Sequence, residues 1–124
     1  MRIHLIAVAI IILTVTGCAQ YNSMVNQTGN QSFTGSWNSS FGVVTLFQKG
    51  DKVAGSYTHD KGKIAGTVNN NVFTGTWAES PSYLPPKDSG EVEFTLSSDG
   101  KTWSGKWRYG SSGAWKTDWT GTRI

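Results

Sequence analysis

The chain lacks most of what marks disulfide-rich, helical or strongly charged proteins. It has 1 Cys in 124 residues, which excludes an intrachain disulfide framework. Its formal net charge of +3 is too small to indicate a nucleic acid or an acidic partner. No window carries apolar residues at helical spacing, so nothing supports a helical domain. The core must therefore come from aromatic side chains buried in a β-structure.

What the chain does contain is 15 Gly and 6 Trp, arranged in a repeated pattern. Residues 33–37 read FTGSW, and in a strand Phe33, Gly35 and Trp37 share one face. Similar segments follow at 53–57, 64–68, 73–77, 103–107 and, as a variant, 119–123. Gly inside a strand costs stability unless it marks a bend or makes room for a bulky neighbour. The repeat therefore indicates a strongly curved sheet, as in a small closed barrel.

Alternating polarity and turn residues predict about eight strands. The expected ranges are 32–38, 43–48, 53–58, 63–68, 72–78, 91–97, 102–109 and 115–123. The long connection 79–89 holds all three prolines, and we expect it to be a stiff lid or a crossover rather than a hairpin. An up-and-down sheet of about eight strands can close on itself. We predict an all-β fold, a small antiparallel up-and-down β-barrel over residues 32–124.

Residues 1–17 are predicted to form an export signal. Its apolar run at 5–13 is too short to remain as a membrane-spanning helix. The run leads to VTGC at residues 15–18, which resembles the lipobox of bacterial lipoproteins. That resemblance implies cleavage before Cys18 and acyl chains such as palmitate on the mature protein. A plain secretory signal with a coincidental Cys is the alternative.

The lipobox resemblance also implies a location in the cell envelope. Ala19 follows the Cys, which is typical of an outer-membrane address in a host with two membranes. Residues 18–31 are mostly Gln, Asn, Ser, Thr and Gly without a period, so we expect the lipidated Cys18 to be followed by a flexible tether. Several acyl chains anchor a protein more firmly than one. The membrane is therefore the first partner that the sequence predicts.

The strand motifs at 33–42, 53–57 and 102–107 resemble those of the avidin and streptavidin family. The wider calycin group, which includes the lipocalins, shares a Gly-x-Trp on its first strand and a basic residue on its last. Trp37 and Arg123 match that pair. The resemblance implies a barrel closed at one end by the Arg123 guanidinium packed on Trp37, a contact that the ring quadrupole favours.

The same resemblance carries over only part of the biotin site. Tyr57 matches the tyrosine that helps bind the ureido oxygen, and Trp103 matches a wall tryptophan. The remaining donor positions fall at Ser39, Val43 and His59. Val43 cannot donate a hydrogen bond, so the set of donors is incomplete. The resemblance therefore supports the fold more strongly than it supports biotin as the ligand.

Large aromatic side chains are expected on the inward face. They are Phe33, Trp37, Tyr57, Phe73, Trp77, Phe94, Trp103, Trp107, Trp115 and Trp119. A barrel of this size is either just filled by side chains or holds one small ligand, and both interpretations remain open. For a pocket at the mouth, the expected lining is the 79–89 loop with Trp37, Ser39, Tyr57, Trp77, Trp103 and Trp107.

Other chemistry finds little support in the sequence. His59 is the lone His after Cys18, and no particular Ser can be tied to it, so we predict no metal, no cofactor and no catalytic residue. Glu91 and Glu93 share an outward face, where carboxylates favour solubility. The basic residues 106 and 108 lie on the face opposite the tryptophans of their strand, which argues against a nucleic-acid platform.

Two functional hypotheses follow. The first is a membrane-anchored, non-catalytic lipoprotein that binds a small apolar or aromatic molecule, or a short peptide, at the barrel mouth. The alternative is a structural or partner-binding envelope lipoprotein, similar for example to barrel-shaped protease inhibitors, with a solid core and working loops. Exposure of Tyr83 and Leu84 in the long loop would favour the alternative.

Overall fold

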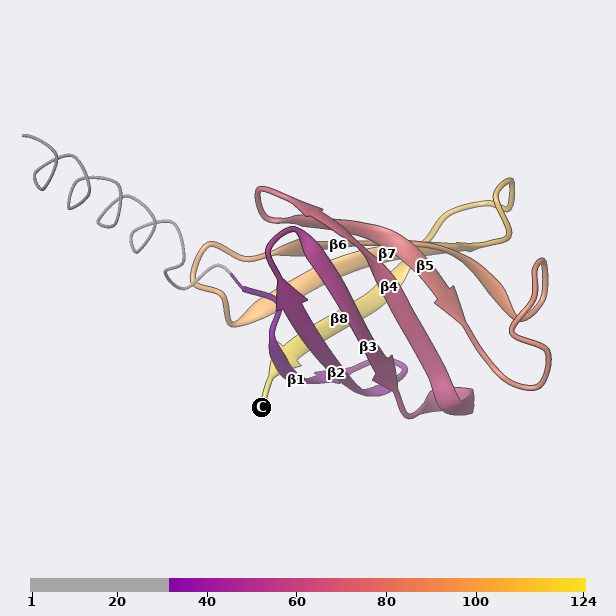
Figure 1. The fold of residues 1–124 in the computed structure, drawn as a ribbon, viewed down its shortest axis with the longest axis horizontal. Coiled ribbons are helices and arrows are strands. Elements are labelled where there is room, and N and C mark those ends of the chain that lie inside the picture. The colour runs from indigo at the N-terminus through magenta and orange to yellow at the C-terminus, as the bar shows by residue number, and fades with distance from the viewer. Residues whose placement is uncertain (1–31) are drawn as a thin grey trace, which may run out of the picture. The chain divides into compact units, whose positions relative to one another are not determined.

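The computed structural model describes residues 32–124. The predicted signal, Cys18 and the tether lie outside these residues. Eight antiparallel strands follow one another and pair in chain order to form a closed barrel, which confirms the predicted fold class (Figure 1). They are β1 (Gly35–Ser39), β2 (Gly42–Lys49), β3 (Lys52–Tyr57), β4 (Gly62–Asn69), β5 (Val72–Ala78), β6 (Ser89–Leu96), β7 (Thr102–Tyr109) and β8 (Lys116–Arg123). A short 3-10 helix, η1 (His59–Lys61), lies between β3 and β4.

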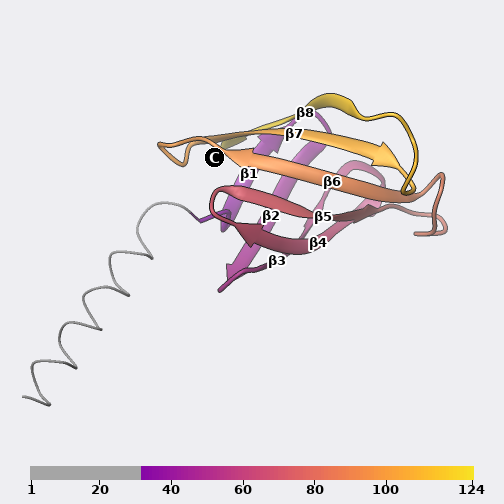
Figure 2. The ribbon, with the colours of Figure 1, turned by 90° about the horizontal axis from the view of Figure 1, so that it is seen from above.

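The first and last strands close the barrel. Trp37 in β1 stands opposite Arg123 in β8, and Ser39 stands opposite Gly121. Seen from above, β6 and β7 cross in front of β1 and β2, with the interior between them (Figure 2). Closure leaves no strand edge unpaired along the sheet, so the aromatic face is turned away from water. Within residues 32–124 the structure contains no helix long and apolar enough to cross a membrane.

The predicted strands agree with the observed ones to within a few residues. The largest shift is in β1, because the segment before it is held by side chains. The Phe33 backbone N–H donates to the side-chain oxygen of Gln48 at 3.0 Å. The backbone N–H of Gln48 donates to the Thr34 hydroxyl at 2.9 Å. The long connection joins the adjacent strands β5 and β6, where Trp77 stands opposite Gly90. It is a long hairpin loop, so the expectation of a crossover was wrong.

The interior of the barrel is packed with aromatic and aliphatic side chains. Trp103 stacks on Phe94 with ring centroids 3.9 Å apart and meets the edge of Trp37 at 6.1 Å. Trp119 links Phe94 to Tyr57 through ring contacts of 5.2 and 5.0 Å. Most of the predicted inward residues therefore form one contiguous core, and the space between Trp37 and Trp103 is filled.

Two glycines show why the repeat needs its small residue. A methyl group added at Gly121 would lie 2.3 Å from the Trp103 ring, and one added at Gly105 would lie 2.6 Å from the Phe94 ring. Both distances are far below a normal carbon contact. Gly thus makes room for a ring from a neighbouring strand, as the sequence pattern indicated.

Trp115 corrects the predicted inward set. Its side chain is 39% exposed and lies outside the barrel, beneath the side chains of Lys106 and Arg108. The register of β7 and β8 shifts between Gly105 and Trp107, which adds a residue on the β8 side. Such a bulge reverses the facing of the residues beyond it. Alternation alone would put Trp115 on the same face as Trp119, and the bulge between them turns Trp115 outward.

One end of the barrel is closed by Arg123. Its guanidinium carbon lies 4.1 Å from the centroid of the Trp37 ring, so the expected pair is present. The same group donates to the backbone carbonyls of Ser32, Thr34 and Gly100 at 2.9, 2.6 and 3.0 Å. Charge-assisted bonds of this kind are stronger than neutral ones. This end, which we call the closed end, leaves no room for a ligand beneath Trp37.

Candidate functional site

The opposite end of the barrel, here called the mouth, is bordered by four loops. They comprise residues 40–41, 58–61, 79–88 and 110–115. Two of them are joined directly, because the Ser80 amide donates to the Asp60 carbonyl at 2.9 Å and the Tyr83 hydroxyl donates to the Lys61 carbonyl at 3.1 Å. These two hydrogen bonds hold residues 60–61 and 80–83 side by side.

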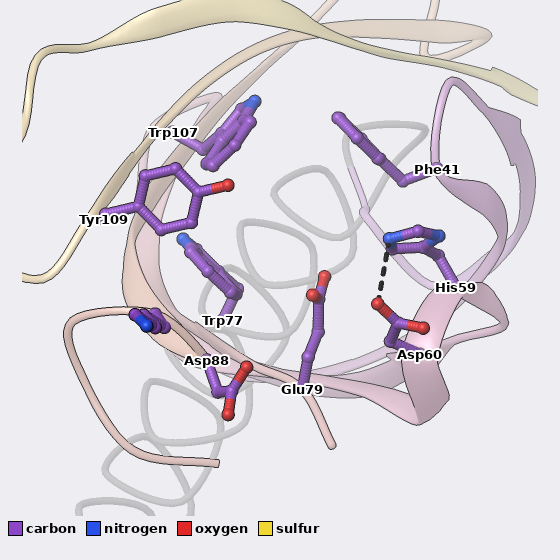
Figure 3. A pocket seen from close by; sticks show the side chains of 9 residues that line it. Phe41, His59, Asp60, Trp77, Glu79, Asp88, Trp107 and Tyr109 are labelled. Carbon is purple, nitrogen blue, oxygen red and sulfur yellow. Dashed lines mark ion pairs between the residues drawn. The ribbon is translucent and has the colours of Figure 1, made fainter. Parts of the chain in front are cut away.

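A cleft of about 220 Å³ opens between these loops. It is lined by Phe41, His59, Asp60, Trp77, Glu79, Lys87, Asp88, Trp107 and Tyr109. Figure 3 shows two unlike sides, with Trp77, Trp107 and Tyr109 together on one and Phe41, His59 and Asp60 on the other. Glu79 projects from below into the space between them. The cleft therefore combines an aromatic wall with a group of ionisable side chains.

The aromatic wall is held rigidly. Trp77 meets Trp107 edge to face at 5.6 Å, and Tyr109 contacts both rings at 5.7 and 5.0 Å. The Trp77 indole donates to the Arg108 carbonyl and the Trp107 indole donates to Asp118 at 2.8 Å. Because both indole N–H groups are already bonded, the two tryptophans offer ring carbon to the cleft, and the Tyr109 hydroxyl, which points into the cleft in Figure 3, adds one polar group. Such a surface suits an apolar or aromatic group.

The ionisable side of the cleft is anchored by Tyr57. The Tyr57 hydroxyl donates to a Glu79 carboxylate oxygen at 2.7 Å. Burial, and then the hydrogen bond to Glu79, raises the pKa of Tyr57 well above its ordinary value. The phenol therefore keeps its proton and remains a donor to Glu79. Beside it, His59 Nε2 lies 3.2 Å from an Asp60 carboxylate oxygen.

The six residues predicted to line a pocket occupy different places. Trp77 and Trp107 line the cleft. Tyr57 lies below it and reaches it only through Glu79.

The other three predicted residues serve packing. The Ser39 hydroxyl donates to the Gly42 carbonyl at 2.6 Å and accepts from the Trp119 indole at 3.2 Å. Trp37 and Trp103 are 0% and 2% exposed, deep in the core. The structure therefore brings together only part of the predicted set, around the mouth rather than inside the barrel.

Phe41 and Asp60, which lie in the mouth loops, were not predicted to line the cleft. Glu79, Lys87 and Asp88 belong to the 79–89 loop, which was expected to line it. Loop residues follow no period of 2, so alternation gives no information on where they point. The one usable signal was the Pro-rich segment, which was expected to border the mouth and does so with three of these residues.

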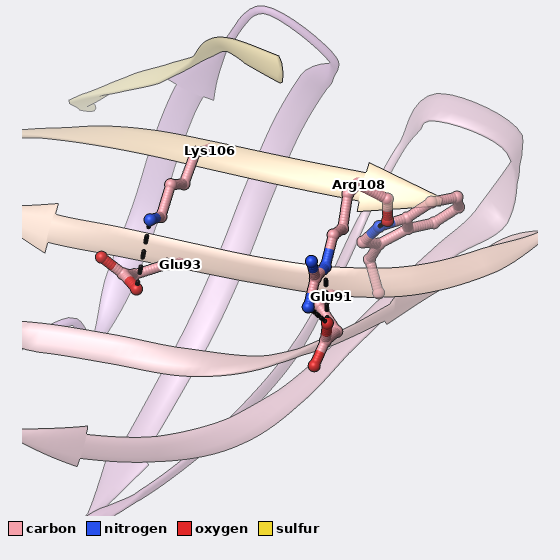
Figure 4. A network of polar contacts seen from close by, with 5 residues as sticks. Glu91, Glu93, Lys106 and Arg108 are labelled. Atoms are coloured by element: carbon pink, nitrogen blue, oxygen red, sulfur yellow. Dashed lines mark hydrogen bonds and ion pairs between the residues drawn. The ribbon is translucent and has the colours of Figure 1, made fainter. Parts of the chain in front are cut away.

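The outer face of β6 and β7 carries a separate group of charges. Arg108 Nε donates to Glu91 at 2.6 Å, and Lys106 lies 4.0 Å from Glu93, as Figure 4 shows. Trp115 joins this face, with the Arg108 guanidinium 4.4 Å from its ring centroid. Lys106 and Arg108 lie on the face opposite the tryptophans of their own strand, but the bulge between β7 and β8 brings Trp115 beside them. The carboxylates nonetheless partner both cations, so little free positive charge remains for a nucleic acid.

Comparisons of the chain with protein-family models, with curated proteins and with solved structures find no significant match.

Proposed function

We propose that the protein is a membrane-anchored, non-catalytic lipoprotein that binds a small apolar or aromatic molecule, or the side chain of a short peptide, in the cleft at the barrel mouth. The observation that carries this proposal is the unequal filling of the barrel. The closed end is plugged by Arg123, whereas the mouth holds a cleft of about 220 Å³ with an aromatic wall. Apolar walls with a few placed polar groups are typical of small-molecule sites.

The size of the cleft limits the ligand. Sites for drug-sized molecules have volumes of roughly 300–1,000 Å³. The cleft is smaller, at about 220 Å³. We therefore expect a ligand of about one ring system, stacked on Trp107 and Tyr109, which is 44% exposed. A fatty acid or another long chain would not fit, since the interior below is filled.

Tryptophan fluorescence of the purified protein, recorded during a screen of small aromatic and apolar compounds, tests the proposal. A binder should change the emission of the wild type and of Trp115→Phe, because Trp115 lies outside the barrel. It should bind up to about tenfold more weakly to Trp107→Ala, since the lost stacking is worth on the order of 0.5–1.5 kcal/mol. A response that survives Trp107→Ala unchanged would place the ligand elsewhere, and a complete screen without any binder would count against the proposal.

Membrane anchoring is proposed from the lipobox-like residues 15–18. Expression with labelled palmitate in a bacterial host should label the wild type but not Cys18→Ser. The variant should leave the membrane fraction. A labelled Cys18→Ser variant would contradict lipidation at this residue, and separation of the two membranes would test the outer-membrane location.

A second candidate function is partner binding through the Pro-rich loop. Leu84 is 64% exposed at the tip of this loop, as that hypothesis requires. Tyr83, by contrast, packs back on the barrel, with Lys63 Nζ 5.2 Å from its ring centroid. Of the two loop residues that this hypothesis requires to be exposed, Leu84 is available to a partner and Tyr83 is not. Loss of a captured envelope protein on Leu84→Asp, with small-molecule binding unchanged, would favour this function over the first.

A further inference from the structure

The ionisable side of the cleft has a feature that small-molecule binding does not use. The ligand-type atoms of His59, Asp60 and Glu79 all lie within 4.8 Å of one another. We propose that these three side chains bind a divalent first-row transition-metal ion of the Zn²⁺ class. This metal site lies in the same cleft as the proposed small-molecule site. It does not depend on that function, because His59, Asp60 and Glu79 could hold the ion without any organic ligand.

The spacing of the three groups suits one ion. Two N or O ligands, each about 2.1 Å from Zn²⁺, lie roughly 3.4 Å apart in a tetrahedral site. The 3.2 Å between His59 Nε2 and Asp60 is already at that separation. No separation exceeds 4.8 Å, so the widest pair needs a closure of at most about 1.4 Å. Side-chain rotation can supply it, because His59 and Asp60 are exposed and Glu79 is half-buried.

The surroundings hold the ligands in place. The buried phenol of Tyr57 donates to Glu79 at 2.7 Å, and the Phe41 ring lies 5.8 Å from the imidazole of His59. The backbone bond from Ser80 to the Asp60 carbonyl joins the two loops that carry the ligands. Hydrogen bonds to a coordinating carboxylate orient it and are a regular part of metal sites. This support distinguishes the group from carboxylates that merely share a surface.

Charge and ligand type indicate which ion. The cleft lining has three carboxylates, Asp60, Glu79 and Asp88, and one Lys, giving a formal balance of −3 + 1 = −2 with His59 neutral. A divalent cation would neutralise this charge. Imidazole together with carboxylates suits Zn²⁺, Co²⁺ and Ni²⁺, whereas Ca²⁺ takes six to eight oxygen ligands and Mg²⁺ keeps most of its water.

Three protein ligands leave a coordination position free. In Figure 3 Glu79 reaches toward the space in front of Trp77, so the free position would face the aromatic wall. Sites with three protein ligands hold water or an exogenous donor atom at the fourth position. A molecule with an aromatic body and an N or O donor would thus contact both sides of the cleft.

Titration of the untagged, metal-free full chain with Co²⁺ tests the metal site. We expect a saturable visible absorption band, quenching of Trp fluorescence from the nearby Trp77 and Trp107, and displacement of Co²⁺ by Zn²⁺ but not by Mg²⁺. His59→Ala and Glu79→Gln should each weaken binding by at least about tenfold. Glu93→Gln, which removes the same charge from the outer face, should bind as the wild type does.

Tyr57→Phe provides a second test of the metal site. It removes the hydroxyl that donates to Glu79 but keeps the ring and all three proposed ligands. Loss of a hydrogen bond to a coordinating group should weaken Co²⁺ binding by about tenfold. Circular dichroism checks that each variant is folded. Absence of Co²⁺ and Zn²⁺ binding to the wild type, or equal binding by His59→Ala, would overturn the proposal. Either result would leave the fluorescence screen with organic compounds unaffected, so the two proposals can fail separately.

Discussion

The two ends of the barrel are built from the same strands, but one end is plugged by a side chain and the other holds a cleft. At the closed end a single cation, Arg123, satisfies three backbone carbonyls and covers the Trp37 ring. At the mouth, by contrast, Lys116 Nζ lies 5.7 Å from the Trp107 ring centroid. Carboxylates and a His border a cleft there, with aromatic rings on its other side. The closed end is thus organised for stability, and the mouth keeps polar groups that stability alone does not require.

The comparison indicates where function should lie. Buried charged groups that are fully hydrogen-bonded serve structure, whereas grouped ionisable side chains around a cleft are candidates for binding. In the residues that the structure describes, Trp103 Nε1 is the one buried side-chain polar atom without a hydrogen-bond partner. The core therefore carries little polar chemistry. Changes toward the closed end are therefore expected to cost more stability than changes at the mouth.

The largest effect is expected at Arg123. Replacement by Ala removes three charge-assisted hydrogen bonds and the stacking on Trp37, and should lower the free energy of unfolding by about 3 kcal/mol. Arg123→Lys keeps the charge but not the planar fork, so about half of the loss should remain. Urea denaturation measures both. A loss below about 1 kcal/mol for Arg123→Ala would show that the closed end does not depend on this residue.

A smaller effect is expected where Gly121 faces Trp103. The added methyl group in Gly121→Ala would lie 2.3 Å from a ring that is packed on both sides, and such overpacking costs about 2 kcal/mol. Trp103→Phe removes the ring atoms nearest to that methyl group. The double variant should therefore lose less stability than the sum of the two single losses. Additive losses in the same denaturation assay would contradict the contact.

At the mouth, Tyr57 gives a pH-dependent effect of about 1 kcal/mol. Its pKa is raised in the folded protein, so the folded state keeps the proton when the unfolded chain, with a Tyr pKa near 10, releases it. The contribution is complete below pH 10 and is lost as pH rises above that value. Between pH 10 and pH 11 the wild type should lose about 1 kcal/mol more than Tyr57→Phe. Equal losses would show that Tyr57 titrates normally.

The strands could be predicted from the sequence because their residues obey a simple period. In Thr102–Tyr109, Trp103 and Trp107 alternate with polar residues, and the observed β7 has the predicted bounds. Closure through Trp37 and Arg123 followed from the resemblance to calycin barrels. Trp115 escaped the alternation because a bulge interrupts it, and a single sequence carries no marker of that bulge.

The cleft could not be predicted in the same way. His59 and Glu79 come together because a backbone hydrogen bond joins Ser80 to Asp60, and such loop contacts leave no periodic trace. A count of His residues alone predicted no metal site, and the one proposed above rests on the carboxylates that the fold brings to His59. Two of the residues predicted to line the mouth pocket, Trp37 and Trp103, lie too deep, because alternation reports which face is inward but not how far the interior is filled.

The smallest effect on stability is expected at Leu84, although the change replaces an apolar side chain by a polar one. Leu84→Ser should alter the free energy of unfolding by less than about 0.5 kcal/mol, because the side chain is 64% exposed. Leu46→Ser, the same substitution in the core, should cost at least about 3 kcal/mol, since Leu46 is 2% exposed. If Leu84→Ser instead weakens small-molecule binding in the fluorescence assay, the loop must fold over the cleft when a ligand is present. If it affects only the capture of a protein partner, the exposed leucine belongs to a second, independent surface of the mouth.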